Sequence, residues 1–267
     1  MITLYKKTLY TIPSDFVICP IYEYDISKAN ISILLNEGLI TTKQFQEFYE
    51  MPREERQIKI GLMQRNDKSL VKSLESGFEK ARQNLCMSNN IQDDEIISIK
   101  KDAMFVCRPL ETTQFGAVRF LLKNVYNMMV KIFKIELYFN ADERGYVLDV
   151  KGIKQEKLLS HQDYYIRFLC ELFNMILYGR YKQAIQYVME FIRLYNNREL
   201  SVEYYREFNS DSMFRCPSTM TFIYNMDCCD ESSKKYLDIT YNQKFNTELY
   251  KVVAGIYTVM CKKPRYF

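Results

Sequence analysis

Segments rich in β-branched and aromatic residues recur along the first 155 residues, separated by segments with helical spacing. Residues 15–25 form the first such segment, and residues 96–106 form another that alternates as a hairpin strand does. Residues 134–140 and 146–152 follow, joined by a turn in which Gly145 supplies a positive φ. The pattern therefore predicts strands at the start, in the middle and at the end of this region.

Residues 41–85 have the spacing of amphipathic helices. In the later part of this segment an apolar residue recurs every fourth position, at Leu70, Leu74 and Phe78. Basic residues lie at other positions around the same helix, as expected for its solvated faces. Thr42 is a candidate N-cap, and Pro52 is expected to break the helix or to start a second one. The sequence thus predicts a helical excursion between two β segments.

The C-terminal part of the chain has a mainly helical pattern. From residue 162 a wide apolar face is formed by Tyr165, Phe168, Leu169, Leu172, Phe173, Ile176 and Leu177. A second helix is expected from Tyr181 to about Tyr195, and the remaining third is less regular. Because no repeat or low-complexity linker is present, the change near Gly152 is one of structural class only. The expected fold class is α+β.

Composition narrows the class of protein. The chain has 267 residues, of which 48% are hydrophobic and 26% charged, so disordered, collagen-like and disulfide-scaffold classes are excluded. Eight cysteines without a CxxC pair and a single histidine, His161, argue against a zinc site, and we expect free thiols. The N-terminus lacks the apolar core of a signal peptide, and charges interrupt the apolar runs. We therefore expect a cytoplasmic protein with no membrane partner.

The distribution of charge is more informative than its sum. The net charge of +4 does not by itself require a polyanionic partner. Residues 100–157 contain eleven basic and seven acidic residues, which accounts for the whole excess. A phosphate-binding surface is therefore expected in this region.

Asp25 and Asp102 form the most informative pair of residues. Each lies in a predicted strand, and the helical excursion separates them. Phosphoryl transfer by two magnesium ions needs carboxylates on rigid neighbouring strands, because the ions must lie about 3.5–4 Å apart. Alternatively, Asp25 caps the following helix and Asp102 is a solvated or bulge residue, and spacing alone favours this second interpretation.

The sequence around both aspartates resembles motifs of family-B DNA polymerases. Residues 24–32 resemble the first palm motif, in which an aspartate is followed by a short turn and a helix. Residues 98–106 resemble the third motif, with Asp102 at its second aspartate and Lys100 in place of the first. Residues 134–138 resemble the lysine-tyrosine motif, and residues 150–153 resemble the lysine-glycine step into the thumb. These matches follow one another in the family's order.

The resemblance implies an architecture and a metal site. It implies a polymerase-like palm domain in residues 1–155, with a helical fingers-like insertion at about 41–90. Residues 156–267 would form a mainly helical, thumb-like domain. Asp25 and Asp102 would be the catalytic residues and the ligands of two Mg²⁺ or Mn²⁺ ions.

The resemblance also implies contacts with substrates. The nucleotide-binding candidates are Arg56, Lys59 and Asn30, and those for nucleic acid are Lys134, Tyr138, Lys151 and Lys154. The spacing of three residues places Arg56 and Lys59 on one helix face, where a solvated surface is the alternative interpretation.

The expected function is template-dependent nucleotidyl transfer to a primer 3′-hydroxyl. Its partners would be primer-template nucleic acid, nucleoside triphosphates and other replication subunits, in a viral or phage setting. The sequence departs from the family at Lys100, at Asn30 in place of a tyrosine, and in the missing second motif. Lys100 and the missing second motif favour a rival function, that of a degenerate polymerase relative that binds nucleic acid or a protein without catalysis. A third interpretation is an unrelated helix-rich interaction protein with two incidental aspartates.

Overall fold

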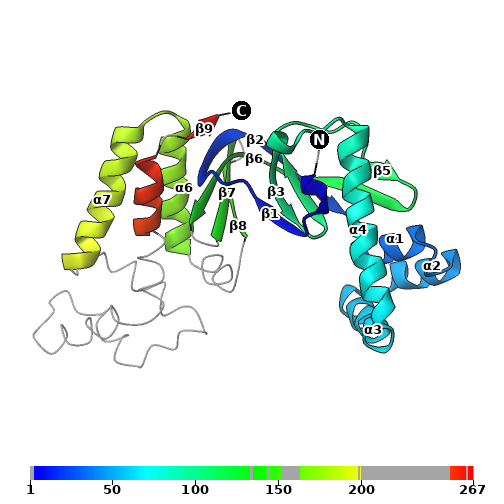
Figure 1. Ribbon diagram of the computed structural model, residues 1–267. Coiled ribbons are helices and arrows are strands. Elements are labelled where there is room, and N and C mark those ends of the chain that lie inside the picture. The colour runs from blue at the N-terminus through cyan, green and yellow to red at the C-terminus, as the bar shows by residue number, and fades with distance from the viewer. Residues whose placement is uncertain are drawn as a thin grey trace, which may run out of the picture. The chain divides into compact units, whose positions relative to one another are not determined.

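The structure is a computed structural model that describes residues 3–132, 135–142, 145–151, 163–197, 199, 253–262 and 264–266 (Figure 1). Its strands are β1 (Leu9–Thr11), β2 (Phe16–Ile26), β3 (Ile96–Lys100), β4 (Ala103–Val106), β5 (Gln114–Phe115), β6 (Val118–Ile132), β7 (Ile135–Asp142), β8 (Gly145–Lys151) and β9 (Arg265–Tyr266). Its helices are α1 (Ala29–Asn36), α2 (Thr42–Glu50), α3 (Arg53–Asn66), α4 (Lys68–Ser88), α6 (Asp163–Leu177) and α7 (Tyr181–Asn197), with short 3₁₀ helices η1 (Leu4–Lys6) and η2 (Asp93–Glu95). Helices and a mainly antiparallel sheet confirm the α+β class.

The chain divides into two compact units that are discontinuous in sequence. The first unit consists of residues 1–13 and 20–125, and the second of residues 14–19 and 126–267. We expected a boundary near residue 155 instead. The hairpin of β7 and β8 groups with the C-terminal helices because α6 contacts both of its strands. Strands β2 and β6 each contribute residues to both units.

The sheet joins strands that are remote in sequence. The strands pair in the order β1-β3-β4-β2-β6-β7-β8, while β5 pairs with β6 and β9 with β2. In the first unit β4 is antiparallel to both β2 and β3. Strands β2 and β3 therefore run parallel with β4 between them, and helices α1 to α4 form the connection. This arrangement is a split β-α-β unit.

The predicted helical excursion is confirmed as four helices. Thr41, not Thr42, is the N-cap of α2, and it forms a capping box with Gln44. Pro52 precedes α3, as expected for a break followed by a second start. The predicted stripe of α4 is buried at Leu70, Leu74 and Phe78. These side chains belong to the hydrophobic core that α4 shares with α1 and with strands β3 and β4.

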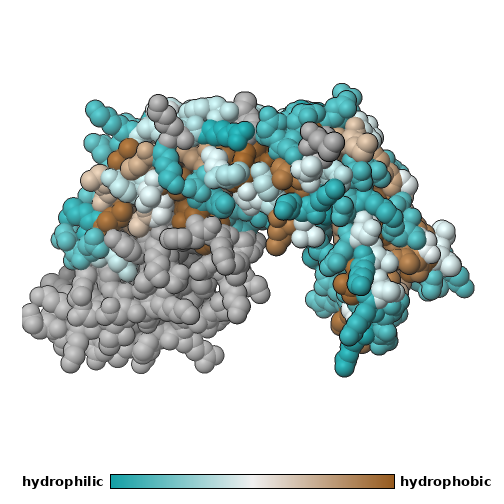
Figure 2. Space-filling model, viewed as in Figure 1, coloured by the Kyte–Doolittle hydropathy of each residue, from teal (hydrophilic) through white to brown (hydrophobic). Residues whose placement is uncertain are grey.

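Helix α3 is the most polar of the four helices. Ile60 is its one buried residue, whereas Ile58 and Leu62 are 65% and 51% exposed. Figure 2 shows hydrophilic side chains along the visible side of α3 and α4, with hydrophobic ones between them. Helix α3 is therefore held by few core contacts, and its charged side chains are available for other roles.

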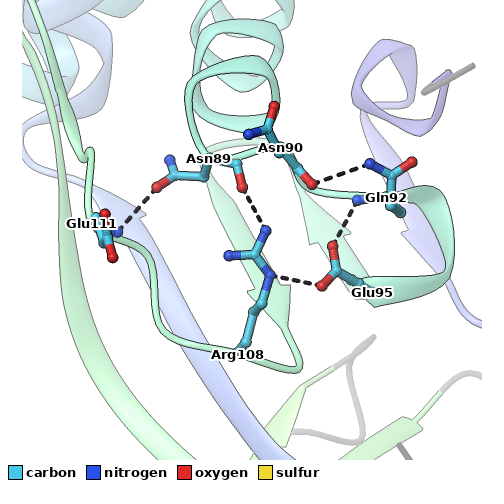
Figure 3. Close-up of polar contacts among 6 residues, drawn as sticks. All are labelled: Asn89, Asn90, Gln92, Glu95, Arg108 and Glu111. Atoms are coloured by element: carbon cyan, nitrogen blue, oxygen red, sulfur yellow. Dashed lines mark hydrogen bonds and ion pairs between the residues drawn. The ribbon is translucent and has the colours of Figure 1, made fainter.

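Polar contacts close the end of the β3–β4 hairpin that lies away from its turn (Figure 3). Arg108 donates from Nε to Glu95 at 2.7 Å and from its guanidinium to the carbonyl oxygen of Asn89. The side chain of Asn89 accepts from the backbone amides of Glu111 and Thr112, both at 3.0 Å. The C-terminus of α4 is thereby joined to the segments that precede β3 and follow β4.

The second unit packs helices on the predicted hairpin. Strands β7 and β8 pair from Asp142 and Gly145 onward, and Gly145 has a φ of +124°. The two predicted helices are confirmed as α6 and α7, and residues 253–260 are helical as well. These helices share one hydrophobic core with β6, β7 and β8. The buried residues of this core include Leu137, Phe139, Phe173, Val188 and Ile256.

Strand β6 is not among the predicted elements. Its middle portion lacks the alternation expected for a half-buried strand, because Leu121, Leu122 and Lys123 are successive exposed residues. The sheet partners of β6, rather than its own pattern, make it a strand.

Two expectations from composition can be compared with the described residues. The five cysteines among them are free thiols, as predicted: Cys19, Cys86, Cys107, Cys170 and Cys261. Within the same part of the chain, every helix is too short or too polar to cross a bilayer.

Candidate functional site

Asp25 and Asp102 meet at one point of the first unit. Asp25 is the penultimate residue of β2 and lies opposite Ala103 of β4. Asp102 lies in the two-residue turn between β3 and β4, because Lys100 pairs with Ala103. The amide of Ile26 donates to the carbonyl oxygen of Asp102 at 3.0 Å. The two aspartates, remote in sequence, are therefore neighbours, as required for a shared site.

The turn position of Asp102 corrects part of the sequence interpretation. We expected this residue inside the β segment of residues 96–106. Lys101 instead has a positive φ of 38°, and the chain reverses direction there. The turn ends the alternation, so Asp102 projects from the tip of the hairpin while Lys100 stays in the ladder opposite Leu9 and Ala103.

A pocket of about 290 Å³ adjoins both carboxylates. It is lined by Asp25, Ile26, Lys28, Ala29, Asn30, Ile31, Arg53, Arg56, Gln57, Ile60, Asp102 and Lys123. The acidic part comes from β2 and the hairpin turn, and four basic residues from α3, β6 and the segment before α1 complete the lining. A pocket with adjacent acidic and basic walls suits a ligand that carries phosphate together with a cation.

The model of one protein family matches the chain over residues 1–254, and its description is bacteriophage PBS1 gene 130 protein. The chain belongs to this family. A search of the curated proteins found no match. The family agrees with the phage or viral setting expected from the sequence, and the match includes every residue that lines the pocket.

The acidic wall of the pocket, formed by Asp25 and Asp102, brings negatively charged carboxylates close to one another. Burial raises the pKa of the Asp25 carboxyl, and the nearby carboxylates of Asp102 and Glu23 raise it further. Lys123 opposes this effect, since its Nζ lies 3.6 Å from Oδ2 of Asp25. Glu23 is 2% exposed and lies two residues before Asp25 on the same strand. A cation bound here would relieve the repulsion among these carboxylates.

The basic wall of the pocket, formed by Lys28, Arg53 and Arg56, lies beside the turn that connects α2 to α3. Lys28 donates from Nζ to the carbonyl oxygen of Tyr49 at 2.6 Å, and the same Nζ lies 3.0 Å from the centre of the Tyr49 ring. Burial and the nearby Arg56 guanidinium lower the pKa of Lys28. Arg56 itself donates to the carbonyl oxygens of Phe48 and Met51, at 3.5 and 3.4 Å. These contacts hold two cations at the pocket.

The first turn of α1 adds backbone donors to the same wall. Ala29, Asn30 and Ile31 line the pocket, and the N-cap residue Lys28 makes no side-chain capping bond. The first amides of a helix have no intrahelical partners and carry a partial positive charge. The start of α1 therefore favours an anion, as the basic side chains around it do.

Two of the three residues that the sequence suggested for nucleotide binding lie at the pocket. Arg56 and Asn30 line the pocket. Lys59 does not: it pairs with Glu55 at 3.6 Å on the exposed side of α3. Arg56 and Lys59 lie three residues apart on α3, so they are neighbours on its surface, but only Arg56 is among the residues that line the pocket.

The residues suggested for nucleic-acid binding lie in the second unit or outside the described residues. Tyr138 is fully buried and donates its hydroxyl to Glu136 at 2.8 Å, so its ring is not on a surface. Lys151 is partly exposed and lies 3.7 Å from Asp149. Lys134 and Lys154 are outside the described residues, as is His161.

Sequence reasoning missed four residues of the site: Glu23, Lys28, Arg53 and Lys123. Arg53 and Lys28 had a usable signal, because each lies where a helix starts: Arg53 follows Pro52, and Lys28 lies within the first motif directly before α1. Lys123 had none, since it lies in the unpredicted strand β6.

The residues present fit a substrate-bound Mg²⁺ ion better than a fully protein-coordinated one. Among the described residues, no group of three or more His, Cys, Asp or Glu side chains could hold a metal. Magnesium commonly binds through one or two carboxylates together with substrate phosphates and water. Asp25 and Asp102 supply those carboxylates beside a basic wall that suits the phosphates.

Proposed function

We propose that the first unit is a nucleotidyltransferase site of the family-B polymerase type, which extends a primer 3′-hydroxyl with nucleoside triphosphates on a nucleic-acid template. One observation carries this proposal. Two aspartates from segments that resemble the first and third palm motifs lie together at a pocket that also contains four basic residues.

The basic wall is assigned to the triphosphate. Arg53, Arg56 and Lys28 line the pocket beside the first turn of α1, so guanidinium, ammonium and backbone donors all converge there. Arginine side chains bind phosphate oxygens in a fork geometry. In this assignment these groups orient the triphosphate and stabilise the negative charge that develops on the leaving pyrophosphate.

The acidic wall is assigned to metal binding. When bound at Asp25 and Asp102, Mg²⁺ would supply Lewis acidity toward the 3′-hydroxyl and the transferred phosphoryl group. The carboxylate of Asp25 is positioned by β2 and that of Asp102 by the hairpin turn, and both are held by backbone pairing. The oxygen of the primer hydroxyl forms the new bond to the α-phosphorus as the bond to pyrophosphate breaks, and the hydroxyl proton is released to water.

Primer extension tests this function. The full chain is incubated with a labelled primer-template, all four deoxynucleoside triphosphates, and Mg²⁺ or Mn²⁺. Asp25→Asn and Asp102→Asn should each lower extension by on the order of 10²–10³-fold, the loss typical for removing an electrostatic group from a transition state. Asp94→Asn is the matched control, because Asp94 is an exposed acid of the same unit outside the pocket. Extension unaffected by either pocket variant would refute the assignment.

One observation favours the second candidate, a non-catalytic module that binds nucleotide or nucleic acid. Lys123 already lies 3.6 Å from Asp25, where it compensates the carboxylate without a metal. A binding module would associate with nucleic acid equally well in EDTA and with a strong dependence on salt. Binding assays with and without Mg²⁺ across a salt series separate the two functions.

A further inference from the structure

Arg82 is a buried cation in the middle of α4. The residue is 1% exposed, its Nε donates to the carbonyl oxygen of Tyr5 at 2.8 Å, and its Nη1 donates to that of Lys101 at 2.7 Å. Nη2 is also buried, and it has no hydrogen-bond partner among the described residues. Burying a guanidinium with an unused donor is unfavourable, and an apolar side chain would avoid that penalty. The two bonds to carbonyl oxygens are therefore what an arginine adds at this position.

One of these bonds fixes the peptide group directly before Asp102. The carbonyl group of Lys101 belongs to the planar peptide unit that joins Lys101 to Asp102, so its direction sets the orientation of that unit. Lys101 has a φ of 38°, in the left-handed region that favours glycine. Phe78, one helical turn before Arg82, also contacts this residue, with 5.2 Å between its ring centre and Nζ of Lys101. A lysine persists in such a conformation only where surrounding contacts hold it.

Contacts from three elements outside the hairpin hold the turn. The amide of Lys101 donates to the carbonyl oxygen of Thr8 at 2.8 Å, in the segment before β1. The carbonyl oxygen of Asp102 accepts from the amide of Ile26 in β2 at 3.0 Å. Arg82 supplies the remaining bond from α4. Of these contacts, the one from Arg82 is made by a side chain, so substitution can remove it while the backbone bonds stay available.

We propose that Arg82 is a positioning residue for Asp102, because it holds the β3–β4 turn in the conformation that brings Asp102 to the pocket. Without this bond, the peptide unit between Lys101 and Asp102 is free to leave its strained conformation, and the Asp102 side chain moves with it. The role in the turn is independent of the proposed function. The expected effect on nucleotidyl transfer rests on that function.

Amide exchange followed by NMR on the full chain tests the role in the turn. The amide of Ile26 reports on the turn, because it donates to Asp102. The amide of Cys107 reports on the far end of the hairpin, where it donates to the carbonyl oxygen of Glu95 at 3.0 Å. In Arg82→Met, exchange at Ile26 should rise roughly tenfold more than exchange at Cys107, the factor expected when a hydrogen bond from a charged group is lost.

Arg108→Met is the matched control. Arg108 is another arginine that donates to a backbone carbonyl oxygen, that of Asn89, but it lies at the end of the hairpin away from the turn (Figure 3). Its removal should speed exchange at Cys107 and not at Ile26. Arg82→Lys keeps the charge without the planar fork, so its Ile26 amide should exchange at an intermediate rate. If Arg82→Met does not fold, Arg82→Lys must still show faster exchange at Ile26 relative to Cys107 than the wild type does.

Primer extension tests the catalytic part of the inference. Per folded molecule, Arg82→Met should lower kcat on the order of 10²-fold, the loss typical of a misplaced reacting group. The KM for nucleoside triphosphate should not change, because the basic wall comes from α3 and the start of α1 and not from the hairpin. Arg108→Met should change neither constant.

The outcomes separate this inference from the proposed function. Faster exchange confined to Ile26, in a chain that extends no primer in any form, would support the role of Arg82 in the turn while the polymerase function fails. An unchanged Ile26 amide, or equal increases at Ile26 and Cys107, would overturn the inference. Undiminished extension by Arg82→Met, or an equal loss in Arg108→Met, would overturn it as well.

Discussion

Gly77 lies where α4 packs closely against α1. A Cβ atom added at Gly77 would lie 2.3 Å from Cγ2 of Ile33 and 3.2 Å from Cγ of Glu37. Ile33 is 1% exposed and lies in α1, the helix that follows β2 and whose first residues line the pocket. A β-branched side chain in a packed core cannot move aside freely, so α1 or α4 must shift. Gly77→Ala is therefore expected to disturb both stability and the pocket.

The magnitude follows from a comparison with Gly61. Gly61 lies in α3, and a Cβ added there would meet no atom within 4 Å. Both substitutions gain about 1 kcal/mol of helix propensity, so this gain cancels when the two variants are compared. The remaining difference is the overpacking at Ile33, about 1–3 kcal/mol. Gly61→Ala should stabilise the protein, and Gly77→Ala should be less stable than Gly61→Ala by that amount.

Urea unfolding followed by far-UV circular dichroism measures this difference. Hydrogen exchange of α1 and α4 peptides locates the effect, since faster exchange in both helices is expected for Gly77→Ala only. If Gly77→Ala proved as stable as Gly61→Ala, with unchanged exchange in α1, the close approach of these helices would be refuted. The reasoning would also fail if Gly61→Ala lost stability.

Two further predictions concern the acidic wall and the hairpin base. The pKa of Asp25 is raised in the folded state, so the folded protein binds the Asp25 carboxyl proton more tightly than the unfolded chain does. The free energy of unfolding therefore falls as pH rises between the unfolded-state pKa and the folded-state pKa of Asp25. Asp25→Asn should thus be more stable than wild type in urea at pH 7, and the difference should shrink toward about pH 4, near the ordinary aspartate pKa; a less stable variant at pH 7 would contradict the cause given for the shift. Asn89→Ala removes the acceptor for the amides of Glu111 and Thr112. It should cost about 1–3 kcal/mol and speed amide exchange in this segment, whereas unchanged exchange would show that the contacts contribute little.

The spacing of apolar and turn residues was sufficient to predict the helices and strands in which buried residues recur at regular intervals. The apolar spacing at Leu70, Leu74 and Phe78 predicted the buried face of α4, because a helix that covers a sheet repeats its contacts every three to four residues. The turn at Gly145 predicted the β7–β8 hairpin, because few residues other than glycine adopt its φ of +124°. The proximity of Asp25 and Asp102 was expected from the motif resemblance. Their spacing in the sequence alone favoured unrelated roles for the two residues.

The remainder of the site depends on packing that local pattern does not encode. Lys123 lies in a strand whose exposed middle resembles a loop, so neither the strand nor its contact with Asp25 could be predicted. Arg56 lines the pocket and Lys59 does not, a difference that depends on the packing around α3 and not on the spacing of the two residues. Tyr138 belongs to a strand segment buried on both faces, where a motif match says nothing about exposure.

The discontinuity of the two units has a genetic consequence. Phe16 belongs to the second unit's core, and Val17 and Ile18 pair with β9, although residues of the first unit precede and follow them in the chain. No single cut in the gene yields both units whole: a fragment that starts at residue 126 lacks this β2 segment. A single genetic crossover within this gene would therefore transmit the two units together or leave at least one of them incomplete.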